Sequence, residues 1–425
     1  MKRYIKSIAL FAAAALGFAS CEDYPDAFVL ADGVPTVHYV RYADREVLID
    51  QAYMGEIVCF VGENLCSVRE LYFNEHPAVL NTSYMTANTL IAAVPGKLPQ
   101  IKTDKVYMIT KNKDTVTVDF KVMMPAPQVK SMSYEYAAPG EEITIYGDYF
   151  SSPLTIDFVG KTVTDADYTI NVSKTALTLN VPEGAGSGPI KVTTESGVGQ
   201  SSFHYMDSRN ILFDWDGSRG GMSEGWGWRS GAALIHTDDP YKGDGSYLMF
   251  GGKPLSGAIG GSWEEDNYCV NYWPDPAGGK PELSSLPEFA EYIDAYGVSG
   301  LQVKFEVLVP TSNPWSSCAL QIIFSGNQHV TNATAGNAFY SDASLPRGLW
   351  IPWLETGSYD TAGKWQTVGI PFSAFTQDHE NKGSSGSFSA DCLTGLTLFV
   401  WHGGVAGTDC EPIICLDNIR VVPLK

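Results

Sequence analysis

The chain has 425 residues and a formal net charge of -20. Such an acidic surface argues against nucleic acid or anionic lipid as a partner, because both are polyanions, and it suits a neutral ligand. About 400 residues remain after an export signal, which is too many for one ordinary hydrophobic core, so we expect two or three domains.

The N-terminus predicts an exported protein. Three basic residues among the first six precede an apolar run from Ile8 to Phe18. This run is too short to span a bilayer as a mature helix and is typical of a secretory signal. Residues 1–20 are therefore predicted to be a signal peptide, and no other apolar stretch is long enough to cross a membrane.

Ala19-Ser20-Cys21 resembles a bacterial lipobox, although Phe18 is an unusual residue three positions before the cysteine. The resemblance implies cleavage before Cys21, acylation of that residue and a lipidated tether over residues 21–35. Glu22-Asp23 resembles the surface-export signal of Bacteroidota lipoproteins, which implies an outer-membrane anchor facing outside. The alternative is an ordinary signal cleaved at Ala19-Ser20, with Cys21 incidental.

Seven cysteines follow Cys21, so at least one thiol stays free. Neither CxxC nor His/Cys ligand spacing occurs, and we expect no metal site and no cofactor. Two readings of Cys59 and Cys66 stay open. They form a disulfide across the turn at Gly62, or they are two small, half-buried thiols that point away from the main core.

Two segments match at an offset of 85 residues. Gly55-Glu56-Ile57-Val58-Cys59-Phe60 aligns with Gly140-Glu141-Glu142-Ile143-Thr144-Ile145, and Val94-Pro95 parallels Val181-Pro182 with two residues inserted. Alternating apolar and polar residues between frequent turns predict short antiparallel strands. The pattern resembles the IPT/TIG family of immunoglobulin-like domains, which implies two β-sandwiches.

We place these sandwiches at residues 36–124 and 125–207, with Phe120 and Phe203 in their closing strands. Neither carries a tryptophan or a histidine cluster, so we interpret both as spacers that hold a third domain away from the membrane.

Residues 208–425 are rich in Gly, Trp, Tyr and Ser and show the pattern of a third, strand-rich domain. The predicted helix is 286–296, with Pro287 near its start. The predicted strands begin at Ile211 and cover 301–307, 319–324, 365–372, 396–401 and 415–422. This set predicts a jelly-roll sandwich, and the fold class of the whole chain is all-β.

Gly363–Phe372 and Leu416–Val421 are similar to segments of jelly-roll carbohydrate-binding modules. With the lipobox and the tandem IPT/TIG-like repeats, the whole chain resembles the xyloglucan-binding surface protein B group of Bacteroidota surface glycan-binding proteins. The resemblance implies binding of a polysaccharide, such as xyloglucan or mixed-linkage β-glucan, without cleavage. It also implies presentation to an outer-membrane glycan importer and its partner lipoprotein.

All ten tryptophans follow residue 210, and an indole is the best side chain for stacking on the apolar face of a pyranose ring. Trp215 and Trp365 lie within predicted strands and are expected in the core, whereas Trp401 stays open between core and ligand. The glycan-binding candidates lie in loops rich in Gly, Asn, Asp, Ser or Pro. They are Trp226, Trp228, Tyr268, Tyr272, Trp273, Trp315, Trp350 and Trp353, of which Trp353 could equally be structural.

Two other functions stay open. A surface adhesin would use the same aromatic residues to bind protein. A glycoside hydrolase would need two carboxylates about 5–9.5 Å apart, for which Asp214, Asp216 and Glu264-Glu265-Asp266 are available, and also Glu224. Asp214 and Asp216 could equally cap a turn, or bind a structural Ca²⁺ together with Asp417.

Overall fold

The computed structural model describes residues 32–425, except 165, 239, 327–329 and 332–335. The predicted signal peptide, Cys21 and the first part of the tether lie outside the described residues. Within the described part, no helix has both the length and the apolar character that crossing a bilayer requires. The chain divides into two compact units, residues 1–125 and 126–425.

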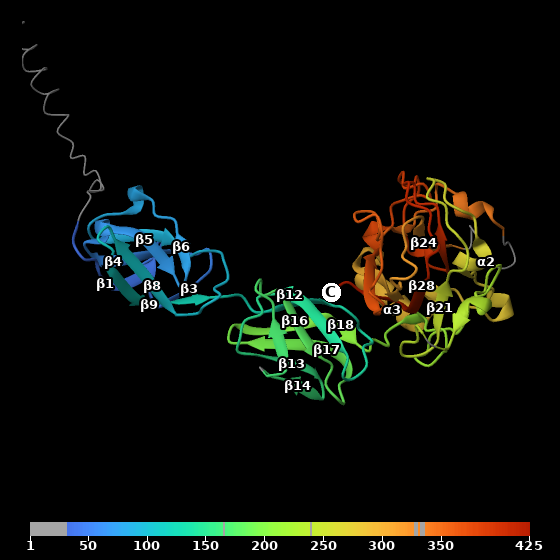
Figure 1. The fold of residues 1–425 in the computed structure, drawn as a ribbon, viewed down its shortest axis with the longest axis horizontal. Coiled ribbons are helices and arrows are strands. Elements are labelled where there is room, and N and C mark those ends of the chain that lie inside the picture. Colours follow the sequence, from blue (N-terminus) through green and yellow to red (C-terminus); the bar gives the residue numbers. More distant parts are fainter. Residues whose placement is uncertain (1–31, 165, 239, 327–329, 332–335) are drawn as a thin grey trace, which may run out of the picture. The chain divides into compact units, whose positions relative to one another are not determined.

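The first unit is a β-sandwich (Figure 1). Its sheets have the strand orders β2-β1-β4-β7 and β6-β5-β8-β9, and β3 pairs with β10 in parallel. The strands are β1 Thr36–Tyr42, β2 Leu48–Ile49, β3 Gln51–Tyr53, β4 Ile57–Glu63, β5 Val68–Phe73, β6 His76–Ala78, β7 Thr89–Ala93, β8 Lys105–Thr110, β9 Thr115–Asp119 and β10 Lys121–Met123. Phe60, Phe73 and Phe120 meet at its centre.

The second sandwich has the sheets β11-β12-β16-β15 and β14-β13-β17-β18, which match those of the first except that the extra edge strand β15 pairs with β16, whereas β2 pairs with β1. Its strands are β11 Gln128–Met132, β12 Glu142–Asp148, β13 Leu154–Val159, β14 Lys161–Val163, β15 Tyr168–Ile170, β16 Ala176–Asn180, β17 Gly186–Thr194 and β18 Gly197–Tyr205. The sequence match of β4 with β12 is therefore a match of equivalent strands. Phe203 lies in β18 as predicted, whereas Phe120 is buried between β9 and β10 rather than in a strand.

Cys59 and Cys66 are free thiols in the structure, and both are buried. Neither belongs to the main core cluster of the first sandwich, which contains their neighbours Val58 and Phe60. The expectation that they point away from that core is therefore met. The two predictions of their state are both wrong, because the cysteines form no disulfide and the thiols are fully rather than half buried. The other five described cysteines are also free.

The C-terminal domain is a sandwich of two larger sheets. One has the order β20-β21-β28-β23-β26, with β19 also paired to β28, and the other is β22-β27-β24-β25. The strands are β19 Ile211–Phe213, β20 Ile235–His236, β21 Tyr247–Phe250, β22 Cys269–Tyr272, β23 Leu301–Leu308, β24 Ala319–Ser325, β25 Gly348–Trp350, β26 Gln366–Pro371, β27 Gly395–Trp401 and β28 Ile414–Pro423; the helices are α2 Glu265–Tyr268 and α3 Pro287–Tyr296. The predicted all-β class is confirmed.

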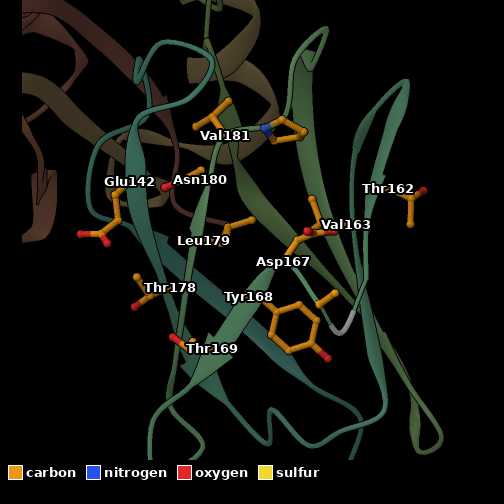
Figure 2. Close-up of a pocket in the computed structure, with 12 residues that line it drawn as sticks. Glu142, Thr162, Val163, Asp167, Tyr168, Thr169, Thr178, Leu179, Asn180 and Val181 are labelled. Carbon is orange, nitrogen blue, oxygen red and sulfur yellow. The ribbon is translucent and has the colours of Figure 1, made fainter.

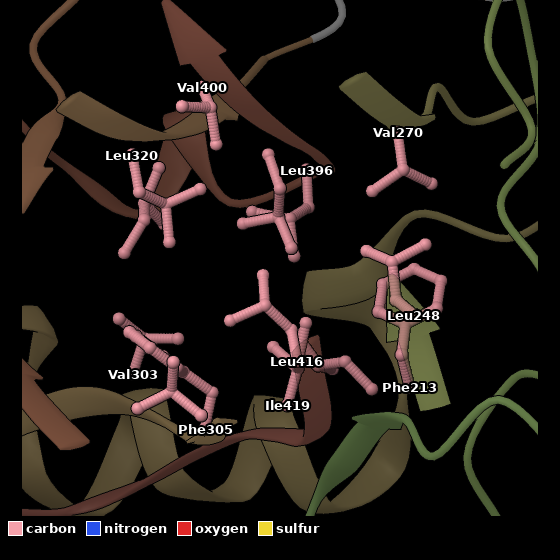
Figure 3. Packing of buried hydrophobic residues seen from close by; sticks show 14 of the residues in the cluster. Phe213, Leu248, Val270, Val303, Phe305, Leu320, Leu396, Val400, Leu416 and Ile419 are labelled. Carbon is pink, nitrogen blue, oxygen red and sulfur yellow. The ribbon is translucent and has the colours of Figure 1, made fainter. Parts of the chain in front are cut away.

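The core of this domain fills the space between its two sheets. Every second residue of β23 points into it, as the alternation in the sequence predicts. Figure 3 shows Leu320, Leu396 and Val400 of one sheet facing Val303, Phe305 and Leu416 of the other. The outward-facing residues of β24, β27 and β28 are buried as well, so other segments cover the outer faces of these strands.

The second sandwich and the C-terminal domain, which lie in one compact unit, share a buried network of charges. Glu135 of the sandwich is 1% exposed, pairs with Lys304 of β23 and accepts a hydrogen bond of 2.6 Å from Arg420 of β28. Arg420 also donates to Glu306 at 2.9 Å. Burial raises the pKa of Glu306 to about 7. The network joins the two domains through charges that cannot reach water.

Candidate functional site

The ten tryptophans differ widely in exposure. Trp228 is 52% exposed and Trp263 is 43% exposed, whereas Trp226 and Trp350 are half-buried. The remaining six are buried: Trp215, Trp273, Trp315, Trp353, Trp365 and Trp401. The core prediction for Trp215 and Trp365 is therefore confirmed. Only Trp228 and Trp263 offer a large open ring surface to a ligand.

Five predicted glycan-binding residues are buried, so the prediction that four of them lie open in loops is wrong, and for Trp353 the structural alternative agrees with the burial. They are Tyr268, Tyr272, Trp273, Trp315 and Trp353, at most 3% exposed. Their polar atoms are bonded inside the protein, as Tyr272 Oη to Pro281 O at 2.8 Å and Trp353 Nε1 to Cys318 O at 2.8 Å illustrate. A buried ring has no face for a sugar, so we remove these residues from the site.

Trp350 and Trp226 are supporting residues rather than open platforms. Trp350 meets the rings of Phe305, Trp315 and Tyr359 edge-on, at centroid distances of 5.4–5.6 Å. The backbone N–H of Trp226 donates to the backbone carbonyl of Asn271 at 2.8 Å along the edge of β22. The ammonium of Lys280 lies 4.7 Å from the centroid of the Trp226 ring. Trp226 therefore holds the start of the turn that carries Trp228.

Trp228 lies at the tip of this turn. Gly227 before it has a φ of 124°, and a Cβ there would come within 3.2 Å of the Trp273 ring. Glycine is thus required for the turn to lie against β22. Arg229, the next residue, lies against β22 again, where its backbone N–H donates to Asn271 Oδ1 at 3.0 Å. Both neighbours of Trp228 are fixed, so its indole projects outward from a defined backbone.

Arg229 also connects the turn to the segment that carries Trp263. Its guanidinium lies 3.0 Å from Glu265 and 3.2 Å from Asp266, and 5.3 Å from the Trp228 ring. Glu265 begins α2, two residues after Trp263. The two exposed tryptophans therefore lie on neighbouring, cross-linked loops beside the sheet β22-β27-β24-β25. We call Trp228 and Trp263 the exposed aromatic patch.

The floor of the patch is aromatic as well. The Trp263 ring stands edge-on to Tyr340, Phe399 and Trp401, with centroid distances of 5.4, 5.3 and 4.8 Å. His379 stacks on Trp401 with ring planes only 9° apart. Burial, helped by the charge of Arg347, lowers the pKa of His379. The lowered pKa favours the neutral form of the imidazole at this edge of the patch.

Sequence reasoning missed Trp263 and His379. Trp263 follows Gly260-Gly261-Ser262, which resembles the glycine-rich setting of Trp228 and could have identified it. Nothing in the sequence around His379 indicates a ligand role, because only the fold brings it to Trp401.

Asp214 and Asp216, which were considered for catalysis or calcium binding, have structural partners. Asp214 accepts hydrogen bonds from Gly217 N at 2.8 Å and Arg219 N at 2.6 Å, and Asp216 accepts one from Ser218 N at 2.9 Å. The carboxylates of Asp214 and Asp216 therefore cap the turn that follows them, which was one of the roles that the sequence left open for this pair. In the described residues, no three His, Cys, Asp or Glu side chains are grouped to hold a metal ion.

A hollow of about 570 Å³ lies in the second sandwich, between β14, β15 and β16 (Figure 2). Its aromatic residue, Tyr168, is 9% exposed, and its hydroxyl donates to Leu154 O at 3.1 Å. The hollow therefore lacks an open aromatic face, and the patch in the C-terminal domain is the stronger candidate site.

Two family models match the chain, one over each of its last two domains. The family model described as the surface glycan-binding protein B xyloglucan binding domain matches residues 205–423, and the IPT/TIG domain model matches residues 127–205. An IPT/TIG domain-containing protein of Bacteroides ovatus is 26% identical over 145 residues, which is 32% of this chain. The match spans only 28% of the length of that relative.

Two solved structures are similar over most of the chain. SGBP-B from a complex xyloglucan utilization locus in Bacteroides uniformis is 16% identical, with a TM-score of 0.42, over 92% of this chain and 100% of that chain. Surface glycan-binding protein PbSGBP-B from Prevotella bryantii is 34% identical, with a TM-score of 0.79, over 93% of this chain and 100% of that chain. The resemblance read from the sequence is thereby confirmed, and the chain belongs to the surface glycan-binding protein B family of cell-surface, glycan-binding proteins.

Proposed function

We propose that this protein binds a neutral plant β-glucan, xyloglucan or mixed-linkage glucan, at the exposed aromatic patch and does not cleave it. The observation that carries the proposal is the pair of open indoles, Trp228 and Trp263, on loops cross-linked by Arg229. An indole covers the apolar face of a glucose ring, and the exposed carboxylate of Asp266 beside it can accept hydrogen bonds from sugar hydroxyls.

Rigidity and charge support the same ligand class. Both loops are held by backbone bonds and ion pairs, so little conformational entropy is lost on binding. The net charge of the chain, -20, disfavours anionic polymers such as pectin. Glu265, a carboxylate close to the patch, is 7% exposed and paired with Arg229, which is unlike a free catalytic acid.

The test is affinity electrophoresis of a soluble form of the chain that begins after Cys21, residues 22–425, in native gels that contain xyloglucan, mixed-linkage β-glucan, mannan, pectin or starch. We expect retardation in a β-glucan gel and free migration in pectin. Chromatography of the polysaccharide after prolonged incubation should show no shortened product. Free migration in every gel would refute glycan binding, and released oligosaccharides would refute the absence of cleavage.

We further propose that acylated Cys21 anchors the protein to the outer face of the outer membrane. There it would present glycan to an importer and its partner lipoprotein, with residues 36–124 and 125–207 between the anchor and the binding domain 208–425. The support is the lipobox-like Ala19-Ser20-Cys21 followed by Glu22-Asp23.

Replacing Cys21 with serine is expected to release the protein from the membrane, because serine cannot receive the thioether-linked lipid. Fractionation of cells and surface proteolysis should find the native protein in the outer membrane and accessible from outside, and the C21S protein in soluble fractions. A serine variant that still sediments with membrane would favour the ordinary signal peptide and another means of attachment.

A further inference from the structure

A cleft of about 450 Å³ lies within the unit 126–425, where the second sandwich meets the C-terminal domain. Tyr134 and Thr144 line it from the sandwich, and Tyr241, Trp365 and Gln366 line it from the C-terminal domain. It is separate from the exposed aromatic patch, with which it shares no residue. Clefts between domains are frequent ligand sites.

The floor of the cleft is aromatic and fixed. Trp365 is 9% exposed, meets the Tyr247 ring edge-on at 6.0 Å, and donates from Nε1 to Tyr241 O at 3.1 Å. Tyr134 and Tyr241 are half-buried and pack against the same small cluster of apolar residues. The buried Trp365 supports Tyr241 rather than stacking on a sugar, and Tyr134 and Tyr241 are the partly accessible rings of the cleft.

The rim of the cleft carries equal numbers of opposite charges. Two are acidic, Glu141 and Glu142, and two are basic, Lys242 and Lys364; all four are exposed, and Lys364 lies 3.9 Å from Glu142. A rim with no net charge attracts neither a polyanion nor a polycation. The cleft thus combines aromatic rings, the amide of Gln366, the hydroxyl of Thr144 and a rim of balanced charge. This combination fits a neutral, hydroxyl-rich ligand such as a saccharide.

The two walls are held in place before any ligand arrives. Thr367, next to Gln366, donates from its N–H to Ser133 O at 2.9 Å, and its hydroxyl receives the N–H of Glu135 at 2.8 Å. The buried ion pairs of Glu135 with Lys304 and Arg420 reinforce this contact. A preformed cleft loses less entropy on binding than one that must assemble.

We propose that this cleft is a second saccharide site, which takes one or two sugar rings of the same polysaccharide that binds the patch. The proposal rests on the proposed function. Two sites on one protein raise the apparent affinity for a long polymer, because once one is occupied the other meets the chain at a high local concentration.

The experiment uses the same soluble form, residues 22–425, in xyloglucan and mixed-linkage β-glucan gels. The double variant Trp228→Ala/Trp263→Ala removes the patch, and we expect it to keep a weak retardation. Adding Tyr241→Ala is expected to weaken that remainder about tenfold, by loss of one stacking ring. Gln366→Ala, added instead, should weaken it as well, whereas Tyr296→Ala, an exposed ring on α3, should not.

Tyr241→Ala keeps the backbone carbonyl that Trp365 uses, and thermal unfolding of each variant checks that the fold is intact. Retardation of the wild type with free migration of the patch double variant would overturn the second site and leave the proposed function standing. The second site is also overturned, and the proposed function left standing, if the retardation that the double variant keeps is lowered by neither Tyr241→Ala nor Gln366→Ala. Free migration of the wild type would instead overturn the proposed function, and the second site with it.

Discussion

Replacing Trp263 with alanine is expected to weaken the affinity of the exported chain for its β-glucan about ten- to a hundredfold. The indole is 43% exposed and stands on the rings of Tyr340, Phe399 and Trp401, so its removal takes away a supported stacking surface. Stacking of a flat ring on an aromatic side chain contributes about 1–3 kcal/mol in nucleic-acid complexes, and each 1.4 kcal/mol is tenfold in affinity.

The series that checks this is Trp263→Ala, Trp263→Tyr and Trp228→Ala, with Tyr296→Ala as a matched loss of an exposed ring elsewhere in the domain. Retardation in gels of graded polysaccharide concentration gives the affinity. Trp263→Tyr should recover much of it, because it restores a ring, and Tyr296→Ala should equal the wild type. If both tryptophan-to-alanine variants bind as the wild type does, the ligand lies elsewhere.

Replacing Arg420 with methionine is expected to lower the free energy of unfolding of the unit 126–425 by about 3–5 kcal/mol, the typical cost of breaking a buried ion pair from one side. Arg420 is 0% exposed and donates to Glu135 at 2.6 Å, to Glu306 at 2.9 Å and to Asn418 O at 2.7 Å. Without Arg420, the buried carboxylates of Glu135 and Glu306 lose the guanidinium that both of them share. Denaturant unfolding followed by tryptophan fluorescence measures the change.

Lys130→Met is the control, because it breaks an exposed ion pair, with Asp148, in the same unit. We expect it to cost less than about 1 kcal/mol. Equal stability of the Arg420→Met and Lys130→Met proteins would show that the buried network does not join the domains.

The same network predicts the behaviour of fragments. Residues 126–425 should unfold in a single transition, whereas residues 208–425 lack Glu135, so Lys304 loses its ion-pair partner and Arg420 keeps only Glu306 of its two glutamates. The shorter fragment is therefore expected to be markedly less stable. The sequence indicated only a spacer, whereas in the structure the second sandwich supplies the counter-charge for Lys304 and Arg420 of the C-terminal domain.

The sequence alone determined the layout of the strands. The alternation in Leu301–Val307 reports which residues face the core, because side chains on a strand alternate between its faces. The repeat that aligns Ile57 with Glu142 predicted equivalent strands, because two similar sandwiches need the same turns and core positions. Local spacing and composition carry this information, and the family resemblance came from the same segments.

Exposure of the aromatic residues was decided only by the tertiary structure. Tyr268, Tyr272 and Trp273 lie in a polar, proline-flanked segment, yet α2 and β22 place them under other residues. Trp228 is open because its turn lies on the edge of β22, and Trp263 is close to it because Arg229 reaches Glu265. Burial and long-range ion pairs depend on segments distant in sequence, so the glycines beside Trp228 and Trp263 indicated loops, but only the fold decided which of the ten tryptophans are open.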